Sequence, residues 1–137
     1  MAGSPKEVAE HWFEEVWNQG RRDKIDELLA RDCVIHDGGQ DIAGPDGFKR
    51  FYDQIQNTLS GVRVNPQQVI SEGDYVSVRW ISTGRHKDTG KNVEITGMSL
   101  MRFRDGQCVE AWQNWDLHGM MEQVKAVPER AFSQAAG

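Results

Sequence analysis

The first part of the chain carries apolar residues at helical spacing. Val8, Trp12 and Val16 recur at four-residue intervals, which is typical of a helix that packs one face against a core. Ser4 precedes a proline and, three residues on, Glu7, so the segment also has a typical helix start. Apolar residues at three- and four-residue spacing predict two further helices, and a short apolar run between them predicts a strand. By residue number these elements are helices 5–18, 23–30 and 44–59 and a strand 33–37.

The second part of the chain reads as four consecutive strands. Asp105-Gly106 is the strongest hairpin signal, Glu72-Gly73-Asp74 marks another turn, and Pro66 indicates an edge strand or a bulge. The expected strands span residues 62–71, 75–85, 93–104 and 107–116. This order predicts an α+β fold, in which a curved antiparallel sheet wraps around the N-terminal helices and leaves a cavity suited to a small apolar ligand.

Composition narrows the class of protein. The chain has 137 residues with 38% hydrophobic side chains, which suits a single domain over residues 1–137 with an ordered core of about 5–125. It has no apolar run long enough for a membrane span. Sixteen basic against 21 acidic residues give a net charge of -5, which argues against a nucleic-acid partner.

Metal and redox signals are weak. Cys33 and Cys108 lack metal-binding or redox spacing, and four histidines are scattered over separate elements. We therefore expect neither a metal nor a cofactor. The N-terminus lacks the pattern of a secretory signal, so the sequence predicts a cytoplasmic location.

Several segments together carry a resemblance to a known family. They are Val16-Trp17-Asn18-Gln19-Gly20, Cys33-Val34-Ile35-His36-Asp37, Gly44-Pro45-Asp46-Gly47-Phe48, the strand start 73–80, the hairpin 103–112 and the segment 115–123. The chain resembles the nuclear transport factor 2-like superfamily, and within it the SnoaL-like polyketide cyclase branch. The resemblance implies a cone-shaped (cystatin-like) fold and a homodimer formed through the outer sheet face. It does not fix the reaction, because the same fold hosts cyclases, isomerases, dehydratases, epoxide hydrolases and non-catalytic binders.

Asp116 matches the aspartate that the cyclases use as general acid/base. Strand alternation places Trp112, Asn114 and Asp116 on one face. On the floor of an aromatic pocket, loss of solvation would raise the pKa of this carboxylate and suit it to proton transfer. The alternative is that Asp116 caps the turn into residues 117–124.

Asp37 is the second catalytic candidate, because its segment resembles the one that holds the base of ketosteroid isomerases. Phe13 and Ser99 stand where those enzymes have a phenol and a buried acid, so steroid isomerisation is not expected. Ser99 retains the ability to donate one hydrogen bond to an oxyanion. The alternative for Asp37 is a loop-start residue that bonds its own backbone.

Each of the remaining candidate residues has a purely structural interpretation beside the functional one. The chain also lacks two carboxylates of the limonene epoxide hydrolase site, since Arg79 has no aspartate two residues on and Asn114 occupies the last-strand position. Arg79 either faces the cavity or lies on an exposed strand face. His36 either lines the pocket mouth or is a solvated strand-end residue. The stripe of Trp12, Phe13 and Trp17 is expected to be core rather than pocket.

The sequence thus predicts a cofactor-free, homodimeric SnoaL-like enzyme. It would catalyse an acid/base reaction on a small apolar carbonyl compound. That reaction would be a cyclisation, an isomerisation or a related lyase reaction. The alternative is a non-catalytic small-molecule-binding or dimerisation module of the same fold. The predicted catalytic residues are Asp116 and Asp37, and the predicted substrate-binding residues are His36, Arg79, Ser99, Trp112 and Asn114.

Overall fold

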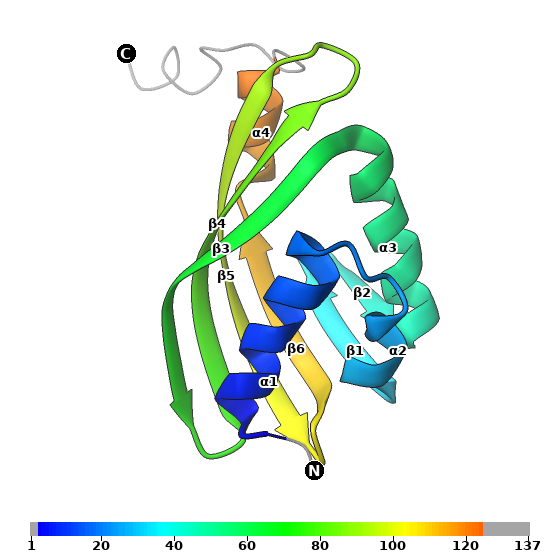
Figure 1. The fold of residues 1–137 in the computed structure, drawn as a ribbon, viewed down its shortest axis with the longest axis vertical. Coiled ribbons are helices and arrows are strands. Elements are labelled where there is room, and N and C mark those ends of the chain that lie inside the picture. Colours follow the sequence, from blue (N-terminus) through cyan, green and yellow to red (C-terminus); the bar gives the residue numbers. More distant parts are fainter. Residues whose placement is uncertain (1–2, 125–137) are drawn as a thin grey trace.

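The computed structural model of the protein describes residues 3–124 and has an α+β architecture, as predicted (Figure 1). Residues 1–2 and 125–137 of the expected domain, and with them the last residue of the expected core, lie outside the described residues. The helices are α1 (Pro5–His11), η1 (Trp12–Asn18), α2 (Lys24–Leu28), α3 (Gly44–Thr58) and α4 (Leu117–Gln123). The strands are β1 (Leu29–Asp37), β2 (Gln40–Ala43), β3 (Leu59–Glu72), β4 (Tyr75–His86), β5 (Asn92–Arg104) and β6 (Gln107–Trp115).

The strands form one curved, open sheet in the order β2-β1-β6-β5-β4-β3, with α1 and η1 lying across its concave side (Figure 1). The sheet is not wholly antiparallel, because β1 pairs with β6 in parallel. A pairing between the first and last long strands is non-local, and the alternation within each strand carries no signal for it. Strand β2 has only four residues and falls between the expected strand 33–37 and the expected helix 44–59, where no element was predicted.

Two local sequence signals have the expected effect on the fold. The Glu7 N–H donates to Ser4 Oγ at 3.2 Å, as the capping box predicts. Strand β3 lies at the sheet edge, and its register with β4 shifts between Pro66 and Gln68, as expected for a proline in a strand. No helix within residues 3–124 combines the length and apolar character needed to cross a membrane.

The expected first helix changes type at Trp12, where α1 continues as the π-helix η1. The wider turn is visible at its end, where the Gln19 N–H donates to the carbonyl oxygen of Glu14 at 2.9 Å. Spacings of three and four residues fit both helix types over two turns, so the sequence pattern alone did not separate them. Bulky side chains of η1 pack on α3, including an edge-to-face contact between Trp12 and Phe48.

Asn18 fixes the end of η1 to β3. Its Nδ2 donates to the Val64 carbonyl at 3.0 Å, and the Val64 N–H donates to Asn18 Oδ1 at 2.7 Å. The side chain thereby satisfies both backbone groups of one strand residue. Nearby, the Tyr52 hydroxyl donates to the Val16 carbonyl at 3.1 Å, so α3 is held to the same helix.

Asn18→Ala is expected to lower the free energy of unfolding by about 2 kcal/mol, because it leaves the partly buried N–H and C=O of Val64 without partners. Asn18→Asp keeps the acceptor for the Val64 N–H but sets a carboxylate oxygen against the Val64 carbonyl and the Glu14 carboxylate, so it should lose at least as much. Urea denaturation of both variants measures this. Asn65→Ala, at an exposed position on the same strand, is the matched control. Equal losses of unfolding free energy in Asn18→Ala and Asn65→Ala would contradict a stabilising role for the Asn18–Val64 hydrogen bonds.

Candidate functional site: a cavity on the concave face of the sheet

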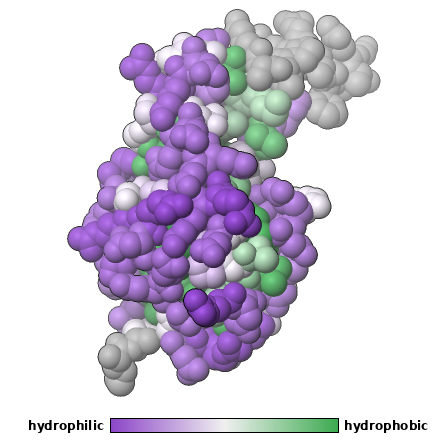
Figure 2. All heavy atoms as spheres, turned by 90° about the vertical axis from the view of Figure 1, so that its right-hand side faces the viewer, coloured by the Kyte–Doolittle hydropathy of each residue, from purple (hydrophilic) through white to green (hydrophobic). Residues whose placement is uncertain are grey.

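A cavity lies between the helices and the concave face of the sheet. Its helical wall comes from η1 and α3, and its other wall from the inward-facing side chains of the strands. Trp12, Phe13 and Trp17 all border it, so the expectation that they are core rather than pocket is confirmed only in part. They are both, since Trp12 and Phe13 are also buried. The outer surface on the α3 side is mainly hydrophilic, with smaller apolar areas (Figure 2).

One row of inward-facing residues in this wall is polar. Ser99 of β5 lies opposite Gln113 of β6, and Gln113 lies opposite Asp37 of β1. Ser99 and Asp37 are each 7% exposed. Ser99 and Gln113 border the cavity directly, whereas Asp37 lies at its edge behind Gln113 and Trp115. This row, in which Gln113 is partly buried, holds most of the polar side chains of a mainly apolar wall; Ser82 on β4 is a further buried polar residue that borders the cavity.

The neighbouring row consists of Trp80, Gly97 and Trp115, on β4, β5 and β6. Trp80 Nε1 donates to Ser99 Oγ at 3.0 Å, and Trp115 Nε1 donates to Asp37 Oδ1 at 3.1 Å. Each indole therefore donates to a polar side chain on the next strand. Because an indole N–H is a donor only, it fixes both oxygens as acceptors in these contacts.

Burial raises the pKa of the Asp37 carboxyl above its ordinary value, and the hydrogen bonds from Trp115 and Gln113 oppose the shift. Neither partner carries a positive charge, so desolvation is only partly compensated. These partners are side chains of β6, rather than the backbone of Asp37 itself as the loop-start alternative requires. The Asp37 carboxylate thus holds a proton more readily than a solvated aspartate does.

The prediction that Asp116 lies on the cavity floor does not hold. Asp116 is exposed and caps α4, with Oδ1 accepting from the Gly119 N–H at 2.8 Å. This capping role is the alternative that the sequence analysis gave for Asp116. Trp112 and Asn114 share a strand face as predicted, but it is the outer one. Alternation defines two faces of β6 without saying which is inner, and each face carries one tryptophan, so hydrophobicity does not decide.

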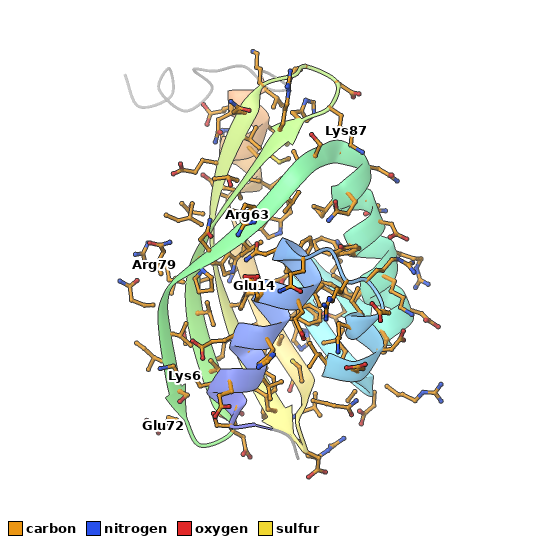
Figure 3. The ribbon with its side chains drawn as sticks, in the orientation of Figure 1. Lys6, Glu14, Arg63, Glu72, Arg79 and Lys87 are labelled. Carbon is orange, nitrogen blue, oxygen red and sulfur yellow. The ribbon has the colours of Figure 1, made fainter. Side chains whose placement is uncertain are left out.

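His36 and Arg79 also lie on the outer face of the sheet. Arg79 projects away from the helices (Figure 3) and donates to Gln68 of the neighbouring strand. The His36 ring stacks on Trp112 with centroids 5.5 Å apart. Of the predicted site residues, only Asp37 and Ser99 therefore lie on the cavity side. Within residues 3–124, no three histidine, cysteine, aspartate or glutamate side chains cluster in a way that could hold a metal ion.

Comparison with known proteins places the chain in a family. The model of the SnoaL-like domain matches residues 9–111. The chain belongs to the SnoaL-like domain family. No curated protein sequence matches it.

Three solved structures illustrate the shared fold. IdmH from Streptomyces antibioticus, described as a proposed polyketide cyclase, is 25% identical with a TM-score of 0.82, over 90% of this chain and 99% of that one. A proposed SnoaL-like polyketide cyclase from Jannaschia sp. CCS1 is 24% identical with a TM-score of 0.81, and the match covers 90% of this chain and 93% of that one. A protein of ketosteroid isomerase-like fold from Catenulispora acidiphila, solved with trimethylamine, is 18% identical with a TM-score of 0.80, and the match covers 92% of this chain and 96% of that one. The nuclear transport factor 2-like fold is thereby confirmed.

In this SnoaL-like domain, sequence reasoning missed Gln113, Trp80 and Trp115 as site residues. One feature of the sequence is related to the two tryptophans. Gly97 interrupts the interior of a strand, where glycine often marks the close approach of another group, and Trp80 and Trp115 flank it in the sheet.

Asp116→Ala should lower the free energy of unfolding by about 1 kcal/mol, because alanine cannot accept the Gly119 N–H at the start of α4. Asp116→Asn can still cap the helix and should lose much less. Urea denaturation at pH 7 measures both variants. Stability equal to wild type in Asp116→Ala would contradict the capping role.

The ion pairs of His36 predict a pH-dependent contribution to stability. Its Nε2 lies 2.8 Å from Glu110 and its Nδ1 2.8 Å from Asp41, while Arg102 also contacts Glu110. Hydrogen bonds to Glu110 and Asp41 raise the pKa of His36. A raised pKa in the folded state means that this stabilisation is fully present below the unfolded value of about 6.5 and is lost as pH rises through the folded value.

His36→Gln is therefore expected to destabilise the protein more at pH 6 than at pH 9, as measured by urea denaturation across this range. His86→Gln is the matched control, because the His86 ring contacts the Thr89 hydroxyl instead of a carboxylate. A loss in His36→Gln that does not depend on pH would contradict the prediction.

Proposed function

We propose that the cavity binds a small, ring-containing carbonyl compound and that Asp37 and Ser99 carry out acid/base chemistry on it. The observation that carries the proposal is the row of Ser99, Gln113 and Asp37 in a wall that is mainly apolar. An apolar cavity with a few convergent polar groups and one carboxyl of raised pKa is typical of a ligand or active site.

In the proposed reaction, the Asp37 carboxylate accepts a proton from the carbon next to the ligand carbonyl. The electron pair of that C–H bond forms a double bond to the carbonyl carbon, the π pair of the carbonyl moves to its oxygen, and the Ser99 hydroxyl donates a hydrogen bond to the resulting enolate oxygen. Where the ligand is an unsaturated ketone, the enolate extends over its second double bond, and protonated Asp37 returns the proton to the far carbon of that system, which is an isomerisation. Alternatively, the enolate carbon attacks a second carbonyl and Asp37 protonates the new alkoxide, which closes a ring by an aldol step.

The relatives support this class of reaction. IdmH, at 25% identity, and the Jannaschia protein are both described as proposed polyketide cyclases. The alternative is a non-catalytic binding domain of the same fold. One observation favours it, namely that Asp37 does not border the cavity itself while its partners Gln113 and Trp115 do.

Deuterium exchange of a simple ketone separates the two functions. The protein should accelerate exchange of the protons next to the carbonyl of 1-tetralone in D2O, followed by NMR, and the rate should rise with pH through the raised pKa of Asp37. Asp37→Asn should slow exchange by about 100-fold and Ser99→Ala by a similar factor, with binding by calorimetry retained.

Asp116→Asn, which changes a carboxylate outside the cavity, is the control and should exchange at the wild-type rate. Binding of 1-tetralone without accelerated exchange would favour the binding domain. Absence of binding by the wild-type protein to both 1-tetralone and acetophenone would contradict the cavity proposal as a whole.

We also propose that the protein is a homodimer formed through the outer sheet face. Met98, Leu100 and Trp112 are exposed apolar side chains on neighbouring positions of this face, and association would cover them. Sedimentation should give a dimer at micromolar concentration and a folded monomer for Leu100→Asp. Leu117→Asp, at an exposed position on α4, should remain dimeric, and a wild-type monomer would contradict the proposal.

A further inference from the structure

Gly97 lies where the cavity wall has no room for a side chain. A Cβ atom built on it would be 2.2 Å from Cζ2 and 2.4 Å from Cη2 of Trp80, far closer than packed atoms approach. The Trp80 ring therefore lies against the backbone of Gly97. The residues described with positive φ do not include Gly97, so its backbone conformation does not require glycine. Space for the indole is the remaining physical reason for a glycine inside this strand.

The position of the Trp80 ring also determines what Ser99 can do. Trp80 Nε1 donates to Ser99 Oγ at 3.0 Å, so Ser99 acts as the acceptor in that bond. Its own hydroxyl hydrogen is then free to be donated to a ligand oxygen in the cavity. If the indole moved away from the sheet, it would both narrow the cavity and lose this bond.

We propose that Gly97 is the specificity-determining residue of the cavity and that Trp80 is a positioning residue for Ser99. The missing side chain at position 97 lets the indole lie flat on the sheet, which keeps the cavity wide enough for a two-ring ketone. The same placement orients Ser99 toward the ligand carbonyl. This inference rests on the proposed function for the nature of the ligand, whereas the displacement of Trp80 can be measured without any ligand.

Gly97→Ala is the direct test. A methyl group at this position must move the ring from 2.2 Å to an ordinary contact of at least 3.4 Å, which drives it into the cavity. We expect the affinity for 1-tetralone to fall about tenfold, as a consequence of this overpacking, and the affinity for the one-ring ketone acetophenone to change by less than about threefold. In the ligand-free protein, the indole N–H NMR signal of Trp80 should shift as the bond to Ser99 is lost.

Two variants make the result specific. Gly97→Ala combined with Trp80→Phe restores space through a smaller ring, so it should recover the affinity for 1-tetralone. It should not recover ketone deuterium exchange, because phenylalanine cannot donate to Ser99. Gly39→Ala is the matched control, since nothing lies within 4 Å of a Cβ at that position, and it should behave as wild type.

The outcomes separate this inference from the proposed function. If wild type binds neither ketone, the proposed function fails, and a shifted Trp80 signal in Gly97→Ala still supports the role of Gly97 in placing Trp80. An unchanged Trp80 signal with unchanged 1-tetralone affinity overturns the inference even if wild type is an active enzyme. If Gly97→Ala does not fold, recovery of folding by the added Trp80→Phe supports the inference, and a double variant that also fails to fold overturns it.

Discussion

Backbone hydrogen bonds between β1 and β6 join the first long strand of the chain to the last in a parallel pair. Their register sets Asp37 opposite Gln113, and the antiparallel register of β6 with β5 continues the same row to Ser99. The polar row of the cavity therefore exists only because β1, from the first part of the chain, is aligned with the hairpin of β5 and β6 near its end. A shift of one residue in β6 would turn Gln113 outward and bring Trp112 into the cavity.

Burial of this polar row has a cost that the indoles offset. Asp37 and Ser99 are removed from solvent, and an unpaired polar group in such a place destabilises a fold by about 1–3 kcal/mol. Trp115 and Trp80 each supply one N–H donor from within the cavity wall, and among the described residues no buried side-chain nitrogen or oxygen lacks a partner. Tryptophan suits this task because it contributes apolar wall and hydrogen-bond donor from one side chain.

Sequence patterns predicted the elements far better than the arrangement of the site. The capping box at Ser4, the helical stripes and the Asp105-Gly106 hairpin are local signals, and the corresponding elements were found. The inner face of β6 is not a local property, because the segment from Trp112 to Trp115 has one tryptophan and one polar residue on each face. Asp116 was assigned by family resemblance to the cavity floor, yet the helix that follows uses it as a cap. Asp37 and Ser99 were also proposed from family resemblance, and both lie on the inner face of the sheet, where Ser99 borders the cavity and Asp37 lies behind Gln113 and Trp115.

The distribution of tryptophans gives the protein a built-in optical label. Four of its five tryptophans, Trp12, Trp17, Trp80 and Trp115, border the cavity. The fifth, Trp112, stacks on His36 at the outer sheet face. Intrinsic fluorescence therefore originates mostly from indoles that border one cavity, whereas Trp112 lies on the sheet face that the proposed dimer would cover. Emission from this chain can thus distinguish an event inside the fold from one on its exterior without an attached dye.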